Sequence, residues 1–191
     1  MEKRNLEKTR NALLSAAQKL MLECEDPSEV TSRAITSEAG VNLAMINYCF
    51  GSREALLYET FSRIQNTLQK DNTDFLKIIA GLGSPKEKLT EIYINSVRLM
   101  LSNYKFVKAV TKYSLTERRI SEDHGSLPFV EAHFAGKKSR DECLLIAYEL
   151  SSVHELAVLR YEEYRDKCGT DLKNDDVLRE FVKKHIDRYL N

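Results

Sequence analysis

Apolar residues recur along most of the chain at intervals of three to four positions, which is the spacing of one face of an α-helix. The first such pattern covers residues 6–24 and ends at Asp26-Pro27, because the residue before a proline disfavours helical backbone. Only 7 Gly and 3 Pro interrupt the 191 residues, whereas strand-rich chains need frequent turns. The pattern therefore predicts an all-α chain.

Residues that cap helices divide the next part of the chain into short segments. Thr31 precedes a predicted helix over 32–38, Gly40 interrupts that helix, and Asn42 can cap a third helix over 43–49. We therefore expect three helices close together near the start of the chain.

Longer helices are predicted in the second half. Ser84 and Ser139 each begin a Ser-x-x-Glu sequence, which has the spacing of a capping box. The second one opens a helical run over about 139–167, and a last helix follows over about 175–190. Residues 119–136 have the least regular pattern, which His124-Gly125, Pro128 and Gly136 interrupt.

Two short helices joined by a tight turn with glycine describe a helix-turn-helix, here within residues 31–51. Gly40 can adopt the positive φ that the turn needs. The apolar residues expected to hold the motif together are Ile35, Val41, Ile46 and Phe50. The outward side of the third helix would then consist of Leu43, Ala44, Met45, Asn47 and Tyr48. The second helix of such a motif enters the major groove of DNA.

The stretch TSRAITSEAGVNLAMINYCFGSREAL resembles the N-terminal signature of the TetR/AcrR family of transcriptional regulators. The matching elements are Thr31, Ile35, Ala39-Gly40-Val41, Ile46, Tyr48, Phe50 and Ser52-Arg53-Glu54. The resemblance covers about residues 6–66. The positions where the chain departs from the family's usual pattern are Thr36, Ala44, Asn47, Cys49 and Arg53.

The resemblance implies how the motif would meet DNA. It implies that the DNA backbone or nearby bases are held by Ser32, Arg33, Asn42, Tyr48 and Arg53. It implies that base edges are faced by Leu43, Ala44, Met45 and Asn47. An asparagine side chain can pair with adenine through two hydrogen bonds, so Asn47 suits this position although it departs from the pattern.

The resemblance also implies two domains and a homodimer. Residues 6–66 would form the DNA-binding domain, with its helix-turn-helix at about 32–51, and residues 67–191 a helical ligand-sensing and dimerisation domain. The helices over 139–167 and 175–190 would pair with their copies in a partner chain. The first of them is apolar on more than one side, which also fits a central helix within one monomer.

A ligand-released repressor would need a site for a small, largely apolar effector, and the middle of the chain is rich in aromatic residues. Tyr93, Tyr113 and His133 could supply the few polar groups of such a cavity. The same aromatic residues fit an ordinary core equally well.

Charge gives little support to DNA binding, because 29 basic residues balance 29 acidic ones. Residues 1–71 hold nine basic and ten acidic side chains, although neutralising phosphates supplies much of the affinity for DNA. Four of the basic residues cluster at the start of the first predicted helix: Lys3, Arg4, Lys8 and Arg10. That cluster fits contact with DNA and a solvated helix end about equally well.

Few other residues indicate a catalytic, metal-binding or redox role. Cys24, Cys49, Cys143 and Cys168 form no Cys-x-x-Cys pair, so no zinc site, cofactor or disulfide framework is predicted. No apolar stretch has the length of a signal peptide or a membrane span, and a cytoplasmic location is expected. We predict no enzymatic activity. Two alternatives stay open: a redox-sensing regulator that uses Cys49, and a helical enzyme with Cys49 or Cys143 as nucleophile.

Overall fold

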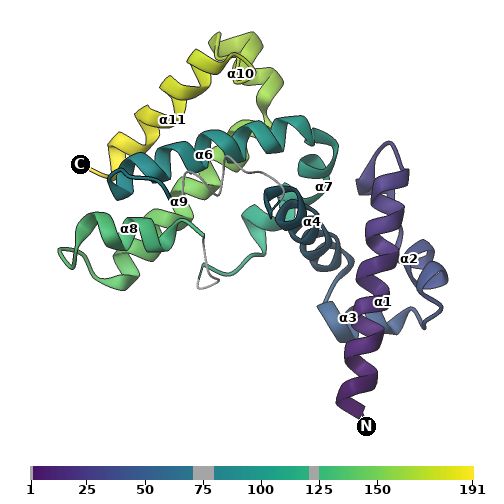
Figure 1. Cartoon of the computed structure of the whole chain (residues 1–191). Coiled ribbons are helices and arrows are strands. Elements are labelled where there is room, and N and C mark those ends of the chain that lie inside the picture. Colours follow the sequence, from purple (N-terminus) through teal and green to yellow (C-terminus); the bar gives the residue numbers. More distant parts are fainter. Residues whose placement is uncertain (1, 71–79, 121–124) are drawn as a thin grey trace. The chain divides into compact units, whose positions relative to one another are not determined.

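The computed structural model describes residues 2–70, 80–120 and 125–191, and these residues form helices and turns without a strand (Figure 1). The prediction of an all-α fold is confirmed for them. Contacts between Cα atoms divide the chain into two units. We call Met1–Asp71 with Lys105–Thr116 the head unit, and Asn72–Tyr104 with Glu117–Asn191 the body unit. None of the helices in the described ranges combines the length and apolarity that crossing a bilayer requires.

The head unit is built around its first helix. Its helices are α1 (Glu2–Glu23), η1 (Pro27–Glu29), α2 (Ser32–Ala39), α3 (Ala44–Phe50), α4 (Arg53–Lys70) and α7 (Tyr104–Thr116). Helix α1 packs against α2, α3 and α4, and Figure 1 shows it running past all three. The fully buried side chains at these contacts include Leu13, Leu14, Ala17, Met21, Ile35, Ile46, Leu56 and Leu57.

Local caps produce the short helices that the sequence predicted. The Thr31 hydroxyl accepts a hydrogen bond from the Ala34 amide at 3.1 Å and so begins α2. Gly40 ends α2 in the left-handed conformation, with a φ of 65°, which favours glycine. The chain then turns through residues 41–43 into α3. The predicted helix-turn-helix form is therefore present.

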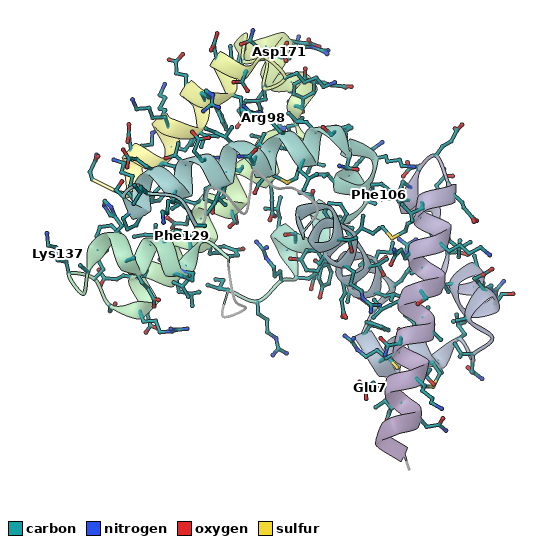
Figure 2. The ribbon with its side chains drawn as sticks, viewed as in Figure 1. Glu7, Arg98, Phe106, Phe129, Lys137 and Asp171 are labelled. Carbon is teal, nitrogen blue, oxygen red and sulfur yellow. The ribbon has the colours of Figure 1, made fainter. Side chains whose placement is uncertain are left out.

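Helix α7 packs against the rest of the head unit through aromatic and polar contacts. The ring of Phe106, which Figure 2 labels, stacks on that of Phe61 in α4 with centroids 6.2 Å apart. The Lys105 ammonium donates to the Cys24 carbonyl at 3.0 Å, just beyond the end of α1. Most of α7 thus lies in the head unit, although the sequence analysis assigned these residues to the second domain.

The body unit contains α6 (Pro85–Ser102), α8 (Leu127–Phe134), α9 (Arg140–Leu159), α10 (Tyr161–Cys168) and α11 (Asp175–Tyr189). Helices α6, α8, α9 and α11 pack around a shared apolar core. Both predicted capping boxes are present, because Ser84 with Glu87 and Ser139 with Glu142 exchange reciprocal hydrogen bonds.

One prediction about the body unit is wrong. The single helix expected over 139–167 is broken at Arg160, because Tyr161 turns into the core and donates to the Asp171 carboxylate at 2.7 Å. Figure 2 labels Asp171 at the bend between α10 and α11. The segment with the least regular sequence pattern, residues 119–136, contains α8, in whose first turn Pro128 is tolerated.

A buried histidine lies in the core of the body unit. His154 of α9 is 1% exposed, its Nδ1 donates to the Leu150 carbonyl at 2.6 Å, and its ring stacks on Tyr93 with centroids 4.4 Å apart. His185 lies beside it, with ring centroids 5.8 Å apart. Burial lowers the pKa of His154 to about 4, and the nearby His185 acts in the same direction. His154 is therefore neutral near pH 7.

This histidine predicts how stability depends on pH. The unfolded chain binds more protons than the folded chain between the ordinary pKa of 6.5 and about 4, so stability falls as pH falls through that window. At about 1.4 kcal/mol per pKa unit, wild type should lose about 3 kcal/mol more than His154→Phe between about pH 7 and pH 4. Urea unfolding at fixed protein concentration measures the difference. His133→Phe, which removes a half-buried histidine, should keep most of the wild-type loss. Equal pH dependence in wild type and His154→Phe would contradict the assignment.

Candidate nucleic-acid interface

One side of α3 faces solvent. The exposed side chains there are Leu43, Ala44, Asn47 and Tyr48. Leu43, just before the helix, is 48% exposed and Tyr48 is 72% exposed, while Met45 is half-buried. A seven-residue helix thus carries apolar and amide groups on its open side, which are the groups that contact base edges in the major groove.

The opposite side of α3 is fixed in the head unit. Ile46 is 2% exposed, and α3 packs against α1 and α4. The Arg10 guanidinium of α1 lies 4.6 Å from the centroid of the Phe50 ring and forms an ion pair with Glu59 of α4. Arg10 therefore connects three helices, which its place in a basic N-terminal cluster did not reveal.

Asn42 lies one residue before the N-cap position of α3, which Leu43 occupies, although the sequence predicted Asn42 as the cap. Its side chain nevertheless bonds to the first amide of the helix. Its Oδ1 accepts from the Ala44 amide at 2.9 Å, and its backbone carbonyl accepts from the Met45 amide at 3.0 Å. The side chain is nevertheless exposed, so its amide nitrogen is open to solvent. Asn42 can therefore hold the start of α3 and still offer a donor to a phosphate oxygen.

Arg53 is bound within the head unit. Its Nη1 donates to the carbonyls of Ser28 at 3.0 Å and Val30 at 3.1 Å, and its Nη2 lies 2.9 Å from the Glu54 carboxylate. These bonds fasten the connection between α1 and α2 to the start of α4. A guanidinium that already donates to two carbonyls is less available to a phosphate. The structure therefore gives Arg53 a role within the head unit, in place of the phosphate contact that the family resemblance implies.

Arg33, unlike Arg53, has a guanidinium that is open to solvent. It lies in the first turn of α2, is exposed, and makes no ion pair or side-chain hydrogen bond with the described residues. Ser32, the residue before it, is half-buried, and its carbonyl accepts from the Thr36 hydroxyl at 2.9 Å. Among the predicted contact residues, Arg33 therefore carries the positive charge that is most available to DNA.

The charge of the head unit differs from that of the first 71 residues. Helix α7 adds Lys105, Lys108 and Lys112 without an acidic residue, so the unit has twelve basic and ten acidic residues. Two of its exposed ion pairs, Arg10–Glu59 and Lys19–Glu38, are of a kind that contributes little stability. The unit is thus slightly basic, and these pairs can be disrupted at small cost when phosphates approach.

The two candidate thiols have surroundings that disfavour reactivity. Burial raises the pKa of Cys49, although Arg10 opposes the rise. Burial, together with Glu131 and Glu142, raises the pKa of Cys143, which is 1% exposed. A thiol reacts as its thiolate, so neither the redox alternative nor the enzyme alternative gains support. Within the described residues, no three His, Cys, Asp or Glu side chains gather as metal ligands would.

The three residues predicted to bind an effector are not brought together within one unit. Tyr113 lies in the head unit, where its ring contacts that of Tyr58 with centroids 5.3 Å apart. Tyr93 is buried in the core of the body unit, and His133 is half-buried there against Phe134. A groove of about 640 Å³ at the start of α6 is lined by none of the three.

The comparisons with known proteins find likenesses among solved structures. No protein-family model matches the chain, and no curated protein matches it. Among solved structures, the chain is similar to native NalD, the secondary repressor of the MexAB-OprM multidrug efflux pump in Pseudomonas aeruginosa. The two sequences are 20% identical, the alignment covers 97% of each chain, and the TM-score is 0.43.

The surroundings of Arg33 and Arg53 predict different effects of removing each charge. Arg33→Ala should weaken binding on all DNA sequences and reduce the slope of log affinity against log salt by about one, because one phosphate contact is lost. Arg53→Ala should leave that slope unchanged and lower the free energy of unfolding by about 1–3 kcal/mol, because charged hydrogen bonds to two carbonyls are lost. Salt titrations and urea unfolding separate the two effects.

Arg63→Ala is the matched control, since Arg63 is an exposed arginine of α4 outside the motif. It should change neither quantity. A reduced salt slope for Arg53→Ala, with Arg33→Ala unchanged, would reverse the assignment.

Proposed function

We propose that the chain is a sequence-specific, DNA-binding transcriptional regulator that acts as a homodimer on a palindromic operator. The observation that supports this most strongly is the solvent-exposed side of α3. Ile46 on the opposite side of the helix is buried, and the left-handed turn at Gly40 precedes the helix. The same stretch carries the ordered residues that resemble the TetR/AcrR signature. Repression is that family's usual mode of action and is our proposal here.

The proposed DNA contacts fall into two groups. Asn47 reads a base edge, because its amide can pair with adenine, and Leu43, Ala44 and Met45 offer apolar contacts of the kind that thymine methyl groups accept. Phosphates are held by exposed or half-exposed polar groups of α2, α3 and the turn between them: Ser32, Arg33, Asn42 and Tyr48. The first group sets sequence preference and the second sets position on the duplex.

The proposed dimer uses an apolar side of α9 that the body core leaves open. The inner side of α9 carries the buried Cys143, Ala147, Leu150, His154, Ala157 and Val158. On another side, Leu145 is 47% exposed and Leu156 is 38% exposed, with Leu159 half-buried nearby in the helical repeat. Phe181 of α11 is also half-buried. A helix with two apolar sides fits an isologous interface between two copies.

A two-fold dimer would place two copies of α3 about 34–36 Å apart, or a multiple of that, over two half-sites. A small, largely apolar effector bound in the body would favour a conformation in which this spacing is lost. By linkage, DNA would then disfavour the effector. A coupling of about 1–3 kcal/mol is typical and would lower operator affinity about 5- to 150-fold at saturation.

The base-reading role of Asn47 is tested by selecting bound duplexes from a random pool with wild type and with Asn47→Ala. Wild type should enrich a pseudo-palindromic site. Asn47→Ala should enrich a site that is degenerate at one base pair per half-site, with a loss of about 1–3 kcal/mol on the wild-type operator. Asn11→Ala, at an exposed asparagine of α1, should enrich the wild-type site. If wild type enriched no site, that result would contradict the proposed function.

The dimer is tested by introducing a charge on the open side of α9. Leu156→Glu should raise the dimer dissociation constant at least about a hundredfold, because a buried unpaired carboxylate costs several kcal/mol in each copy. Leu82→Glu makes the same change at a fully exposed leucine and should leave the dimer intact. Sedimentation at several protein concentrations measures both. A wild-type chain that sediments as a monomer at micromolar concentration would contradict the dimer.

A further inference from the structure

Helix α7 of the head unit carries three exposed lysines on one side. Lys105, Lys108 and Lys112 are spaced three and four residues apart, so they lie within about 60° of one another around the helix. We call them the lysine row. Helix α7 contains no aspartate or glutamate, whereas each of the other described helices longer than eight residues contains residues of both charges. The row is therefore a one-sign surface in a chain of zero net charge.

Contacts within the head unit fix the direction in which the row runs. The Lys105 ammonium donates to the Cys24 carbonyl at 3.0 Å, just beyond the end of α1. Near the other end of α7, the Tyr113 ring contacts the Tyr58 ring of α4, with centroids 5.3 Å apart. The row therefore begins beside the end of α1 and runs toward the first half of α4.

The segment after α1 connects this surface with the proposed DNA interface. It contains η1 and then leads into α2, whose first turn carries the exposed Arg33. Arg53 at the start of α4 donates to the carbonyls of Ser28 and Val30 in the same segment. The starts of α2 and α4 are thus joined by hydrogen bonds, and the lysine row runs toward them from the side of α7.

The lysine row decides the sign of charge of the head unit. Residues 1–71 hold nine basic and ten acidic side chains, and α7 raises the basic count to twelve. Neither Lys108 nor Lys112 makes an ion pair or a side-chain hydrogen bond with the described residues. Hydrogen bonds from Ser28 lower the pKa of Asp26, and the charge of Lys108 adds to this effect. Because Ser28 already satisfies that carboxylate, Lys108 stays available to a partner.

The spacing of the row fits the backbone of one DNA strand. Seven helical steps separate Lys105 from Lys112, which is about 10 Å along the axis of α7. One strand of duplex DNA presents a phosphate about every 3.4 Å of its axis, so about three phosphates fall within that length. A lysine binds phosphate as a point charge and needs no fixed orientation. Three lysines thus match three phosphates in number and in length.

We propose that the lysine row is a second phosphate-binding surface, which holds the DNA backbone beside the base pairs that α3 contacts. This rests on the proposed DNA-binding function, whose contacts lie in α2, α3 and the turn between them, and it extends the interface to α7. Phosphate contacts carry no sequence information directly, so the row strengthens binding to every duplex. The competing partner is the acidic surface of another protein.

The test compares the full wild-type chain with the double variant Lys108→Gln/Lys112→Gln on the duplex recovered by selection. Glutamine favours helix about as well as lysine and removes the charge. At about 0.9 per phosphate, the slope of log affinity against log salt should fall by about two. A second selection should recover the wild-type site. Interference by ethylation of single phosphates should reveal contacts that wild type makes and the double variant lacks.

A second double variant is the matched control. Lys137→Gln/Lys167→Gln removes the same charge from two exposed positions of the body unit, outside both proposed interfaces, and Figure 2 labels Lys137. It should keep the wild-type salt slope and phosphate contacts. Urea unfolding should give all three proteins the same free energy of unfolding, because exposed charges contribute little to stability. Binding to poly-glutamate, an acidic polymer without phosphates, is measured alongside.

The outcomes separate this inference from the proposed function. If Lys108→Gln/Lys112→Gln kept the wild-type slope and phosphate contacts on the selected duplex, the lysine row would be overturned while operator binding stands. If that variant also lost binding to poly-glutamate, the acidic protein would replace DNA as the partner. If wild type bound duplexes without base preference and the variant still lowered the slope by about two, the row would stand and sequence-specific regulation would fail.

Discussion

The head unit depends on the burial of Ile46 within a helix of only seven residues. Because a helix turns 100° per residue, burying Ile46 against α1 and α4 sends Asn47 and Tyr48 toward solvent. The left-handed Gly40 makes this possible, since it ends α2 and lets the chain turn into α3 within a few residues. A Cβ at Gly40 would meet open space, so backbone conformation and not crowding is what favours glycine there.

The charges of this chain act according to their immediate neighbours, and the net charge of the whole chain does not describe them. The formal net charge of zero hides a head unit that is slightly basic, because α7 adds three lysines to it. Arginines with the same charge have different roles according to their neighbours: Arg53 is held by two backbone carbonyls, Arg10 by a ring and a carboxylate, and Arg33 by neither. Of these three, only Arg33 can exchange water for phosphate without breaking a contact with the described residues.

Much of the local structure could be predicted from sequence, because helix starts are determined by residues within one turn. The capping boxes at Ser84 and Ser139, the cap at Thr31 and the turn at Gly40 are all of this kind. The break at Arg160 could not be predicted in the same way. It depends on a hydrogen bond from Tyr161 to Asp171, and the helical pattern continues through it.

The candidate sites, too, combine features that local sequence predicts with features that depend on residues far away in the chain. The open side of α3 follows from helical periodicity around one buried residue, so sequence alone identified Asn47 and Tyr48. The partners of Arg53 are 23 and 25 residues away in the chain, and no spacing rule reveals them. His154 lies on the buried side of α9, and its position in the sequence does not show what surrounds it. Its unpaired Nε2 appears only when the surrounding helices are in place.

The central claim is that the open side of α3 touches DNA, and crosslinking tests it most directly. A benzophenone-bearing phenylalanine analogue is placed at Tyr48, which is 72% exposed, or at Leu82 of the body unit, which is fully exposed and outside the proposed dimer interface. Each protein is irradiated with a DNA duplex recovered by selection. We expect a crosslink to the duplex from position 48, abolished by excess unlabelled duplex, and none from position 82. Absence of a crosslink from position 48, with the duplex shown to be bound, would contradict the claim.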